Sequence, residues 1–226
     1  MYVDVWSDVI CPYCCLGSRH LAQALEAFER ARSVTVRRHA FELDPGATPN
    51  SGLSLIEVLS HKYSMSVERA RAINLRLETE ARNLSMEWSL ENARPTNTLD
   101  AHRVIALAAT QALDEKMSAR LFTAYFAQGE LVSDHATLER LARDVGVTGV
   151  GELWSNDDFV AHVRADEAAA ENLGISGVPS FLVDERFMVV GAQGADQLLS
   201  ALRRAWARRD VQSSTSKGTT AAVATE

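Results

Sequence analysis

The strongest constraint on the fold of this 226-residue chain is the order of its hydrophobic patterns, which changes twice along the sequence. Residues 2–7 alternate and are rich in β-forming types, which predicts a strand, and residues 34–41 predict a second strand. Between them, apolar residues recur at helical spacing from Pro12 to about Ala31. A strand, a crossover helix and another strand together predict a parallel, right-handed βαβ unit.

The second half of the pattern predicts a long helical block and then a return to strands. A loop rich in proline, glycine and asparagine spans residues 44–52, after which helical periodicity replaces the alternation. A last helix of this stretch, at about 157–172, precedes a predicted hairpin with strands at 180–183 and 187–190. An amphipathic helix then begins at Gly194.

The resulting order is β-α-β, a helical block and α-β-β-α, which without the block is the order of a thioredoxin-like core. We therefore predict an α/β fold in which residues 1–46 and 157–210 form a thioredoxin-like domain. Residues 47–156 form an inserted all-helical domain that packs on this core, because its helices have apolar faces to bury. Residues 211–226 lack periodicity and are rich in small polar types, so we predict a disordered tail.

Composition and charge exclude several function classes. A net charge of −7 argues against a nucleic-acid partner, which usually meets a basic face. No apolar run approaches the roughly 20 residues needed to cross a bilayer, and the N-terminus lacks the basic and apolar segments of a secretory signal. We predict a cytoplasmic protein, monomeric or homodimeric, with neither nucleic acid nor membrane as a partner.

The three cysteines of the chain, Cys11, Cys14 and Cys15, lie within five residues of one another. A structural disulfide framework needs cysteines distributed along the chain, so this pattern indicates chemistry. A zinc site needs about four ligands, and His20 is the only further local candidate. Adjacent Cys14 and Cys15 would also project roughly 100° apart on a helix. The cluster therefore favours redox chemistry, and we predict no metal site.

Cys11 and Cys14 are placed for thiol–disulfide exchange. Cys11 follows a predicted strand and a short loop, and Cys14 lies about one turn into the next helix. A helix N-terminus stabilises an anion, and only a thiolate attacks a disulfide. Pro12 suits the first helical turn, and the uncharged Tyr13 adds no cation beside the thiolate. Cys14 can then attack a mixed disulfide at Cys11 and release the partner.

A second element, Val178-Pro179, comes just before the third predicted strand. Proline lacks the N–H that a strand ladder uses, and a cis peptide bond in a turn is one way to accommodate it. In a thioredoxin-like core this loop lies across from the cysteine pair. The backbone of Val178 is then free to pair with a substrate.

These motifs carry a family resemblance that covers about residues 2–208. Its carriers are Ser7-Asp8-Val9-Ile10-Cys11-Pro12-Tyr13-Cys14, Leu16-Gly17, Phe41-Glu42-Leu43-Asp44-Pro45, Asn97-Thr98-Leu99-Asp100-Ala101-His102-Arg103, Gly177-Val178-Pro179-Ser180-Phe181 and Gly191-Ala192-Gln193. The chain resembles the DsbA-like, FrnE-type branch of the thioredoxin superfamily. The resemblance implies a protein disulfide oxidoreductase with an inserted helical domain. It also implies Cys11 as the nucleophile, Cys14 as the resolving thiol and Pro179 as the cis-proline.

The same branch is similar to 2-hydroxychromene-2-carboxylate isomerases and kappa-class glutathione transferases, which use bound glutathione and typically carry serine where Cys11 stands. The intact cysteine pair favours an oxidoreductase that acts on protein or low-molecular-weight thiols and disulfides. We expect no tightly bound cofactor, with glutathione as a candidate co-substrate. The alternatives are a glutathione-dependent isomerase or transferase of small aromatic compounds and, behind it, a non-catalytic redox sensor or binding module.

Three residues each keep two interpretations. Asn97 either caps the following helix, which we favour, or borders a substrate site as in the isomerase relatives. His102 is either a partly buried polar residue or a group that assists proton transfer at Cys14 or orients a substrate. Cys15 departs from the aromatic or aliphatic residue usual in the family. It is either a small buried filler, which we favour, or a thiol that competes with Cys14.

Overall fold

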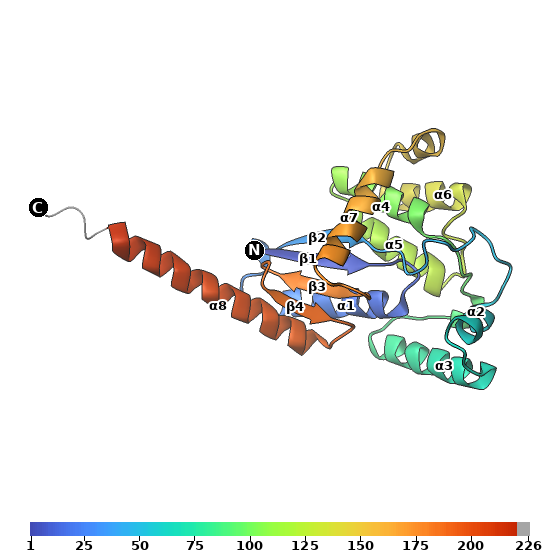
Figure 1. The fold of residues 1–226 in the computed structure, drawn as a ribbon, viewed down its shortest axis with the longest axis horizontal. Coiled ribbons are helices and arrows are strands. Elements are labelled where there is room, and N and C mark those ends of the chain that lie inside the picture. The colour runs from blue at the N-terminus through green and yellow to red at the C-terminus, as the bar shows by residue number, and fades with distance from the viewer. Residues whose placement is uncertain (221–226) are drawn as a thin grey trace, which may run out of the picture.

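A central four-stranded sheet organises the computed structural model, which describes the backbone of residues 1–220 and the side chains of residues 1–209 (Figure 1). The strands are β1 (Tyr2–Ser7), β2 (Thr35–Ala40), β3 (Ser180–Val183) and β4 (Phe187–Val190). Their order across the sheet is β2-β1-β3-β4. Strand β1 runs parallel to β2 and antiparallel to β3, and β3 and β4 form an antiparallel hairpin. The predicted parallel pair and the predicted hairpin are both confirmed.

Helices surround this sheet and extend beyond one end of it (Figure 1). The helices are α1 (Pro12–Glu26), α2 (Leu55–Lys62), α3 (Val67–Asn83), α4 (Leu99–Thr110), α5 (Asp114–Phe126), α6 (His135–Val145), α7 (Val160–Asn172) and α8 (Ala195–Thr220). Short 3-10 turns occur at η1 (Ala31–Ser33), η2 (Leu90–Asn92) and η3 (Val150–Ser155). Together these elements confirm an α/β fold in which a thioredoxin-like core carries a large helical insertion.

Strand β1 sends its side chains alternately to the two faces of the sheet. Val3 and Val5 belong to a hydrophobic cluster with α1 and α8, which cover one face. Asp4 and Trp6 point to the other face, where Trp6 packs with Ala170 of α7. The alternation in residues 2–7 thus reflects two buried faces, one apolar and one that carries charge.

The helical block shares its core with the start of α1. One cluster of buried residues joins Cys11, Cys14 and Leu16 to apolar side chains of α3, α4, α5 and α6. Within the block, helix α6 begins at a capped N-terminus, because the Asp134 carboxylate accepts a 2.8 Å hydrogen bond from the backbone N–H of Thr137. The cysteine-bearing end of α1 is therefore held between the sheet and the helical block.

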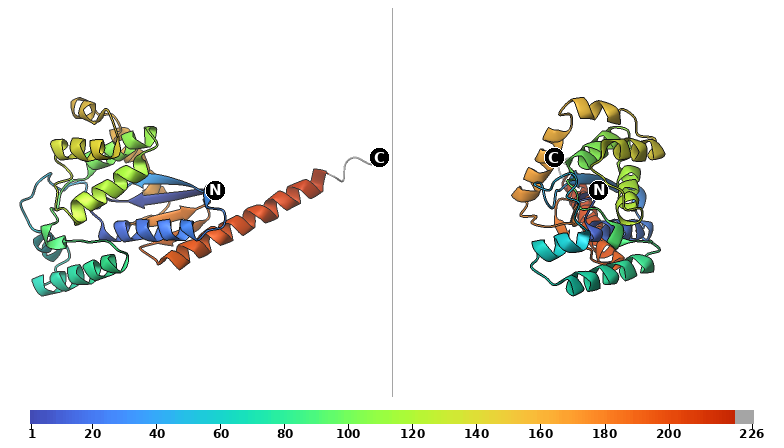
Figure 2. Two further views of the ribbon diagram at one scale, coloured as in Figure 1. Left: turned by 180° about the vertical axis from the view of Figure 1, so that it is seen from behind. Right: turned by 90° about the vertical axis from the view of Figure 1, so that its right-hand side faces the viewer.

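Helix α8 extends past residue 210, where the predicted thioredoxin-like domain ends. Its first turns pack on α1 through Leu198 and Leu202, and the helix then extends away from the body (Figures 1 and 2). Residues 211–220, which belong to the stretch 211–226 predicted as a disordered tail, continue this helix. Once packing has formed the first turns, each further residue adds a backbone hydrogen bond without a new nucleation cost. Residues 221–226 lie outside the described residues.

Candidate active site

The two predicted redox cysteines lie where the loop after β1 enters α1. Cys11 is the N-cap residue of α1, with φ −86° and ψ 114°, and Pro12 occupies the first turn. The backbone N–H of Cys14 donates a 3.1 Å hydrogen bond to the carbonyl of Cys11, which closes that turn. Both residues are buried, with 3% of Cys11 and 1% of Cys14 exposed. Both thiols are unpaired in this structure.

The surroundings of Cys14 hold it as a neutral thiol. Burial, followed by the hydrogen bond to Cys11 and the charge of Cys11, raises the pKa of Cys14 well above its usual value. The backbone N–H of Asp8 lies 3.5 Å from the Cys14 sulfur and acts in the opposite direction by favouring the thiolate. A protonated Cys14 can donate its S–H to the Cys11 sulfur, which is the hydrogen bond that helps to keep Cys14 neutral.

Cys15 faces away from this pair. Its sulfur lies 3.9 Å from the Met86 sulfur, and only 7% of the residue is exposed. Burial and then the nearby charge of Cys11 raise the pKa of Cys15 to about 12. A thiol with this pKa is a poor competitor for a disulfide at neutral pH. The structure therefore favours the interpretation of Cys15 as a small buried filler.

The loop before β3 closes over Cys11. The Val178–Pro179 peptide bond is cis, as the resemblance implied, and the Cys11 sulfur lies 3.6 Å from the Val178 carbonyl oxygen. Gly17 makes this approach possible, because a Cβ at that position would lie 2.9 Å from Pro179 and 3.1 Å from Phe181. The Leu16-Gly17 step of the motif therefore allows α1 to pack directly on the proline.

Asp8 is a site residue that sequence reasoning passed over. Its side chain is completely buried, and one carboxylate oxygen accepts a 2.8 Å hydrogen bond from the backbone N–H of Leu43. Its backbone N–H contacts Cys14, and its charge contributes to the raised pKa of that thiol. The signal was present in the sequence as a carboxylate three residues before Cys11, but an aspartate at the end of a strand is common in loops.

His102 lies behind Asp8 and reaches the cysteines only through it. The His102 side chain is 3% exposed, and its Nε2 lies 3.4 Å from Asp8 Oδ1 without the geometry of a hydrogen bond. The order is therefore His102, then Asp8, then Cys14. This placement supports an indirect influence of His102 on Cys14.

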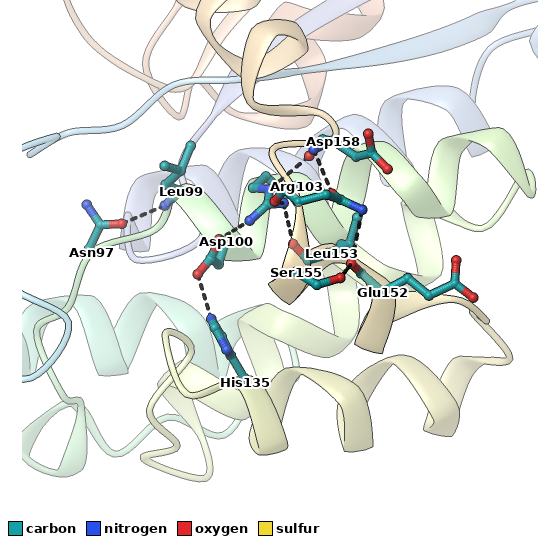
Figure 3. A network of polar contacts seen from close by, with 10 residues as sticks. Asn97, Leu99, Asp100, Arg103, His135, Glu152, Leu153, Ser155 and Asp158 are labelled. Carbon is teal, nitrogen blue, oxygen red and sulfur yellow. Dashed lines mark hydrogen bonds and ion pairs between the residues drawn. The ribbon is translucent and has the colours of Figure 1, made fainter.

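Asn97 acts at the start of α4. Its side-chain oxygen accepts a 2.9 Å hydrogen bond from the backbone N–H of Leu99 (Figure 3). Its amide also donates a 3.3 Å hydrogen bond to the carbonyl of Pro45. The formal N-cap residue, Thr98, makes no side-chain capping bond. Asn97 therefore performs the predicted capping role one residue earlier than the N-cap itself.

A buried arginine fixes the same helix to the chain that leads into α7. Arg103 pairs with Asp100 at 2.8 Å, and Asp100 also contacts His135 at 2.8 Å (Figure 3). The Arg103 guanidinium further donates to the backbone carbonyls of Leu153 at 2.6 Å, Asn156 at 2.7 Å and Asp158 at 2.9 Å. This network orients α4, and with it His102, without contacting the cysteines.

A cavity of about 560 Å³ opens beside Cys11 between α1, α2 and α3. Cys11, Pro12, Tyr13 and Val178 line it. Of the other predicted site residues, Cys14, Pro179, Asn97 and His102 do not border it. The buried amide of Asn74, on α3, also lines the cavity and was not recognised from the sequence, where it stands in an ordinary amphipathic helix.

Among the described residues, no group of three or more His, Cys, Asp or Glu side chains is arranged to hold a metal ion. No helix of the described chain is both long and apolar enough to span a membrane.

Known proteins match both the sequence and the fold. A probable DsbA oxidoreductase from Streptomyces coelicolor is 33% identical, with a TM-score of 0.88 over 92% of this chain and 90% of that one. A 2-hydroxychromene-2-carboxylate isomerase superposes with a TM-score of 0.71 at 15% identity, over 94% and 98% of the two chains. The cytosolic disulfide reductase DsbM from Pseudomonas aeruginosa, solved with GSH, superposes with a TM-score of 0.60 at 18% identity, over 94% of this chain and 98% of that one.

The two matches at 15% and 18% identity show a shared fold only. The family model for the DSBA-like thioredoxin domain covers residues 2–203, which include the cysteine pair, the helical block and the cis-proline loop. This chain therefore belongs to the DSBA-like thioredoxin domain family.

Proposed function

We propose that this protein is a thiol–disulfide oxidoreductase in which Cys11 is the nucleophile and Cys14 the resolving thiol. One observation carries the proposal: Cys11 stands at the N-terminus of α1, contacts the buried thiol of Cys14 and lines a cavity beside the Val178 carbonyl. The helix N-terminus stabilises the thiolate that attacks. The neighbouring thiol lies within reach of the sulfur where a mixed disulfide forms.

The exchange proceeds in two steps that balance. The Cys11 thiolate attacks one sulfur of the substrate disulfide, so that a Cys11–substrate bond forms while the substrate S–S bond breaks and a first thiolate leaves. Cys14 then loses its proton and attacks the Cys11 sulfur, which releases the second thiolate. Two electrons pass from the dithiol to the substrate, and the protein ends with a Cys11–Cys14 disulfide. The first thiolate released takes up the Cys14 proton, so the two steps need no further acid or base to balance.

The decisive experiment separates the two cysteines. With 2-hydroxyethyl disulfide as substrate, Cys11→Ser is expected to abolish exchange, because no thiolate remains at the helix N-terminus. Cys14→Ser is expected to stop after the first step and accumulate a mixed disulfide at Cys11, which intact-protein mass spectrometry detects. Exchange that persists in Cys11→Ser, or a Cys14→Ser variant that turns over at the wild-type rate, would refute these roles.

Continuous turnover needs a thiol that returns the dithiol to its reduced form. We propose glutathione as this co-substrate, with protein or low-molecular-weight disulfides as the acceptors. The fold shared with DsbM, a cytosolic disulfide reductase solved with GSH, supports this assignment and a cytoplasmic location. The test is glutathione-dependent reduction of the oxidised protein, followed by the appearance of free Cys11 and Cys14 thiols.

A second candidate function is a glutathione-dependent isomerase or transferase that acts on small aromatic compounds. The observation that favours it is the cavity beside Cys11, whose exposed lining is mostly apolar. The shared fold with a 2-hydroxychromene-2-carboxylate isomerase is consistent with it. Tight glutathione binding together with an isomerisation rate that survives Cys14→Ser would favour this function over exchange, since isomerisation needs no resolving thiol.

A further inference from the structure

The cavity beside Cys11 has the size and the lining of a small-molecule site. Its volume of about 560 Å³ lies within the range of ligand pockets, roughly 300–1,000 Å³. Apolar side chains of α2 and α3, among them Val58, Leu59 and Ile73, form much of its wall. Cys11 and Tyr13 border the same space, so a molecule held there lies next to the attacking sulfur.

Asn74 is the unusual group in this apolar wall. Only 6% of the residue is exposed, and neither its side-chain oxygen nor its side-chain nitrogen has a hydrogen-bond partner. Buried amides in proteins are nearly always paired, because an unpaired amide loses its bonds to water without replacement. An amide that lines a cavity with both its donor and its acceptor unpaired is suited to a ligand that supplies both.

The charges around the cavity favour an uncharged ligand. Among the described residues that line it, Lys62 is the only cation, and its ammonium pairs with the Asp44 carboxylate at 3.0 Å. Both partners are partly exposed, with 37% and 46% of their side chains accessible. A carboxylate brought against Asn74 would find the side-chain NH2 as its donor, and the one lining cation is already paired with Asp44, so much of its desolvation would go uncompensated.

We propose that this cavity binds an uncharged, largely apolar small molecule that carries a primary amide or a lactam, and that this molecule presents a disulfide sulfur to Cys11. In these two groups the C=O and the N–H lie on the same side, so they can pair with the donor and the acceptor of Asn74 together. The disulfide part of the proposal rests on the proposed function. The recognition part does not, because it concerns binding alone.

The first experiment measures binding without redox chemistry. Ligand-observed NMR compares 4-methylbenzamide with methyl 4-methylbenzoate, two molecules of similar size that differ in the N–H donor. The benzamide is expected to bind about tenfold more tightly, since the ester leaves one Asn74 group unpaired. In Asn74→Leu, which keeps the shape and removes both polar atoms, the two probes are expected to bind equally. Circular dichroism during urea unfolding checks that this variant folds.

The second experiment measures exchange. Reduced protein is mixed with one of three aryl disulfides: bis(4-carbamoylphenyl) disulfide, or the analogue in which a methyl ester or a carboxylate replaces each amide. The arylthiolate released is followed by absorbance. The amide is expected to react fastest, with an amide-to-ester ratio near ten that falls to about one in Asn74→Leu. Leu59→Trp, which fills the cavity, is expected to slow all three substrates. Leu75→Trp, the same change on the exposed face of α3, is the matched control and is expected to match the wild type.

The outcomes separate the two proposals. Equal binding of benzamide and ester to the wild type, or a preference that survives Asn74→Leu, overturns the recognition proposal even when exchange is fast. If the carboxylate substrate reacts fastest, the assignment of an uncharged ligand is overturned. If Leu59→Trp reacts at the wild-type rate, the substrate binds outside the cavity, as expected for a protein substrate that docks on the outer surface. Selective benzamide binding without exchange of any disulfide leaves recognition intact and overturns the proposed redox function.

Discussion

The two halves of the helical insertion differ sharply in how they are packed, although both carry helical periodicity. Helix α5 buries seven residues of its thirteen, and it joins α4 and α6 in the cluster that also contains Cys14. Helix α2 buries none, and α3 buries four of seventeen, one of which is the polar Asn74. In Figures 1 and 2 the pair α2–α3 also stands apart from α4–α6.

This difference indicates a division of labour. Helices α4–α6 form a scaffold that supports the cysteine-bearing end of α1 from behind, through side chains such as Leu121 and Leu141. Helices α2–α3 form one wall of the cavity on the substrate side of Cys11. A wall that encloses a ligand leaves its apolar residues half-buried, because the ligand completes the packing. Stability should therefore depend on the first region and ligand affinity on the second.

The largest effect is expected from Leu121→Ala in α5. Leu121 is fully buried, so its truncation removes apolar contacts and leaves a cavity, at a cost of about 3 kcal/mol in the free energy of unfolding. Urea unfolding followed by circular dichroism measures this loss. A loss below 1 kcal/mol would show that α5 is no better packed than the cavity wall, and the proposed division would then fail.

A second effect, also on the order of 3 kcal/mol, concerns the charged contact that ties α7 to the sheet. His39 of β2 contacts Asp166 of α7 at 2.6 Å and Asp4 of β1 at 2.9 Å, with His162 and Arg37 at the same carboxylates. Burial alone would lower the pKa of His39, but the two carboxylates outweigh it and raise the pKa to about 9. In the unfolded chain the pKa returns to about 6.5.

The sign of the pH dependence follows from this shift. The folded state holds the proton more tightly, so the stabilisation is complete below about pH 6.5 and is lost as the pH rises through about 9. The wild type is expected to lose on the order of 3 kcal/mol over this window relative to His39→Gln, in which no proton is released. Both proteins keep the same cysteines, so thiol ionisation cancels. Parallel stability curves for the two proteins between pH 6 and pH 9.5 would contradict the prediction.

The order of elements was readable from the sequence because each one carries its own periodicity. Alternation in residues 2–7, the helical spacing after Pro12 and the hairpin at 180–190 all appear where they were predicted. The prediction of a disordered tail rested on the weak apolar pattern of residues 211–220, which continue α8 from a packed beginning. The contrast between α2–α3 and α4–α6 was also hidden, because an apolar stripe looks the same whether it faces a core or a cavity.

The site was readable only in part. The cysteine pair and the cis Val178–Pro179 bond follow from motifs, since proline and paired cysteines restrict local chemistry strongly. Asp8 and Asn74 could not be recognised, because their roles come from burial by segments far away in the sequence. The amide of Asn74 would look ordinary on any exposed helix. Only the cavity makes it a candidate for ligand recognition.

The smallest stability effect is expected from Val58→Ala in α2, the counterpart of Leu121→Ala in the scaffold. Val58 is half-buried and borders the cavity, so its truncation should lower the free energy of unfolding by less than about 1 kcal/mol. The same change removes apolar contact with a bound molecule and should weaken 4-methylbenzamide binding about threefold. Urea unfolding and ligand-observed NMR give the two numbers on one variant. A loss of stability as large as that of Leu121→Ala would make α2 part of the core, and the two regions would then no longer differ in kind.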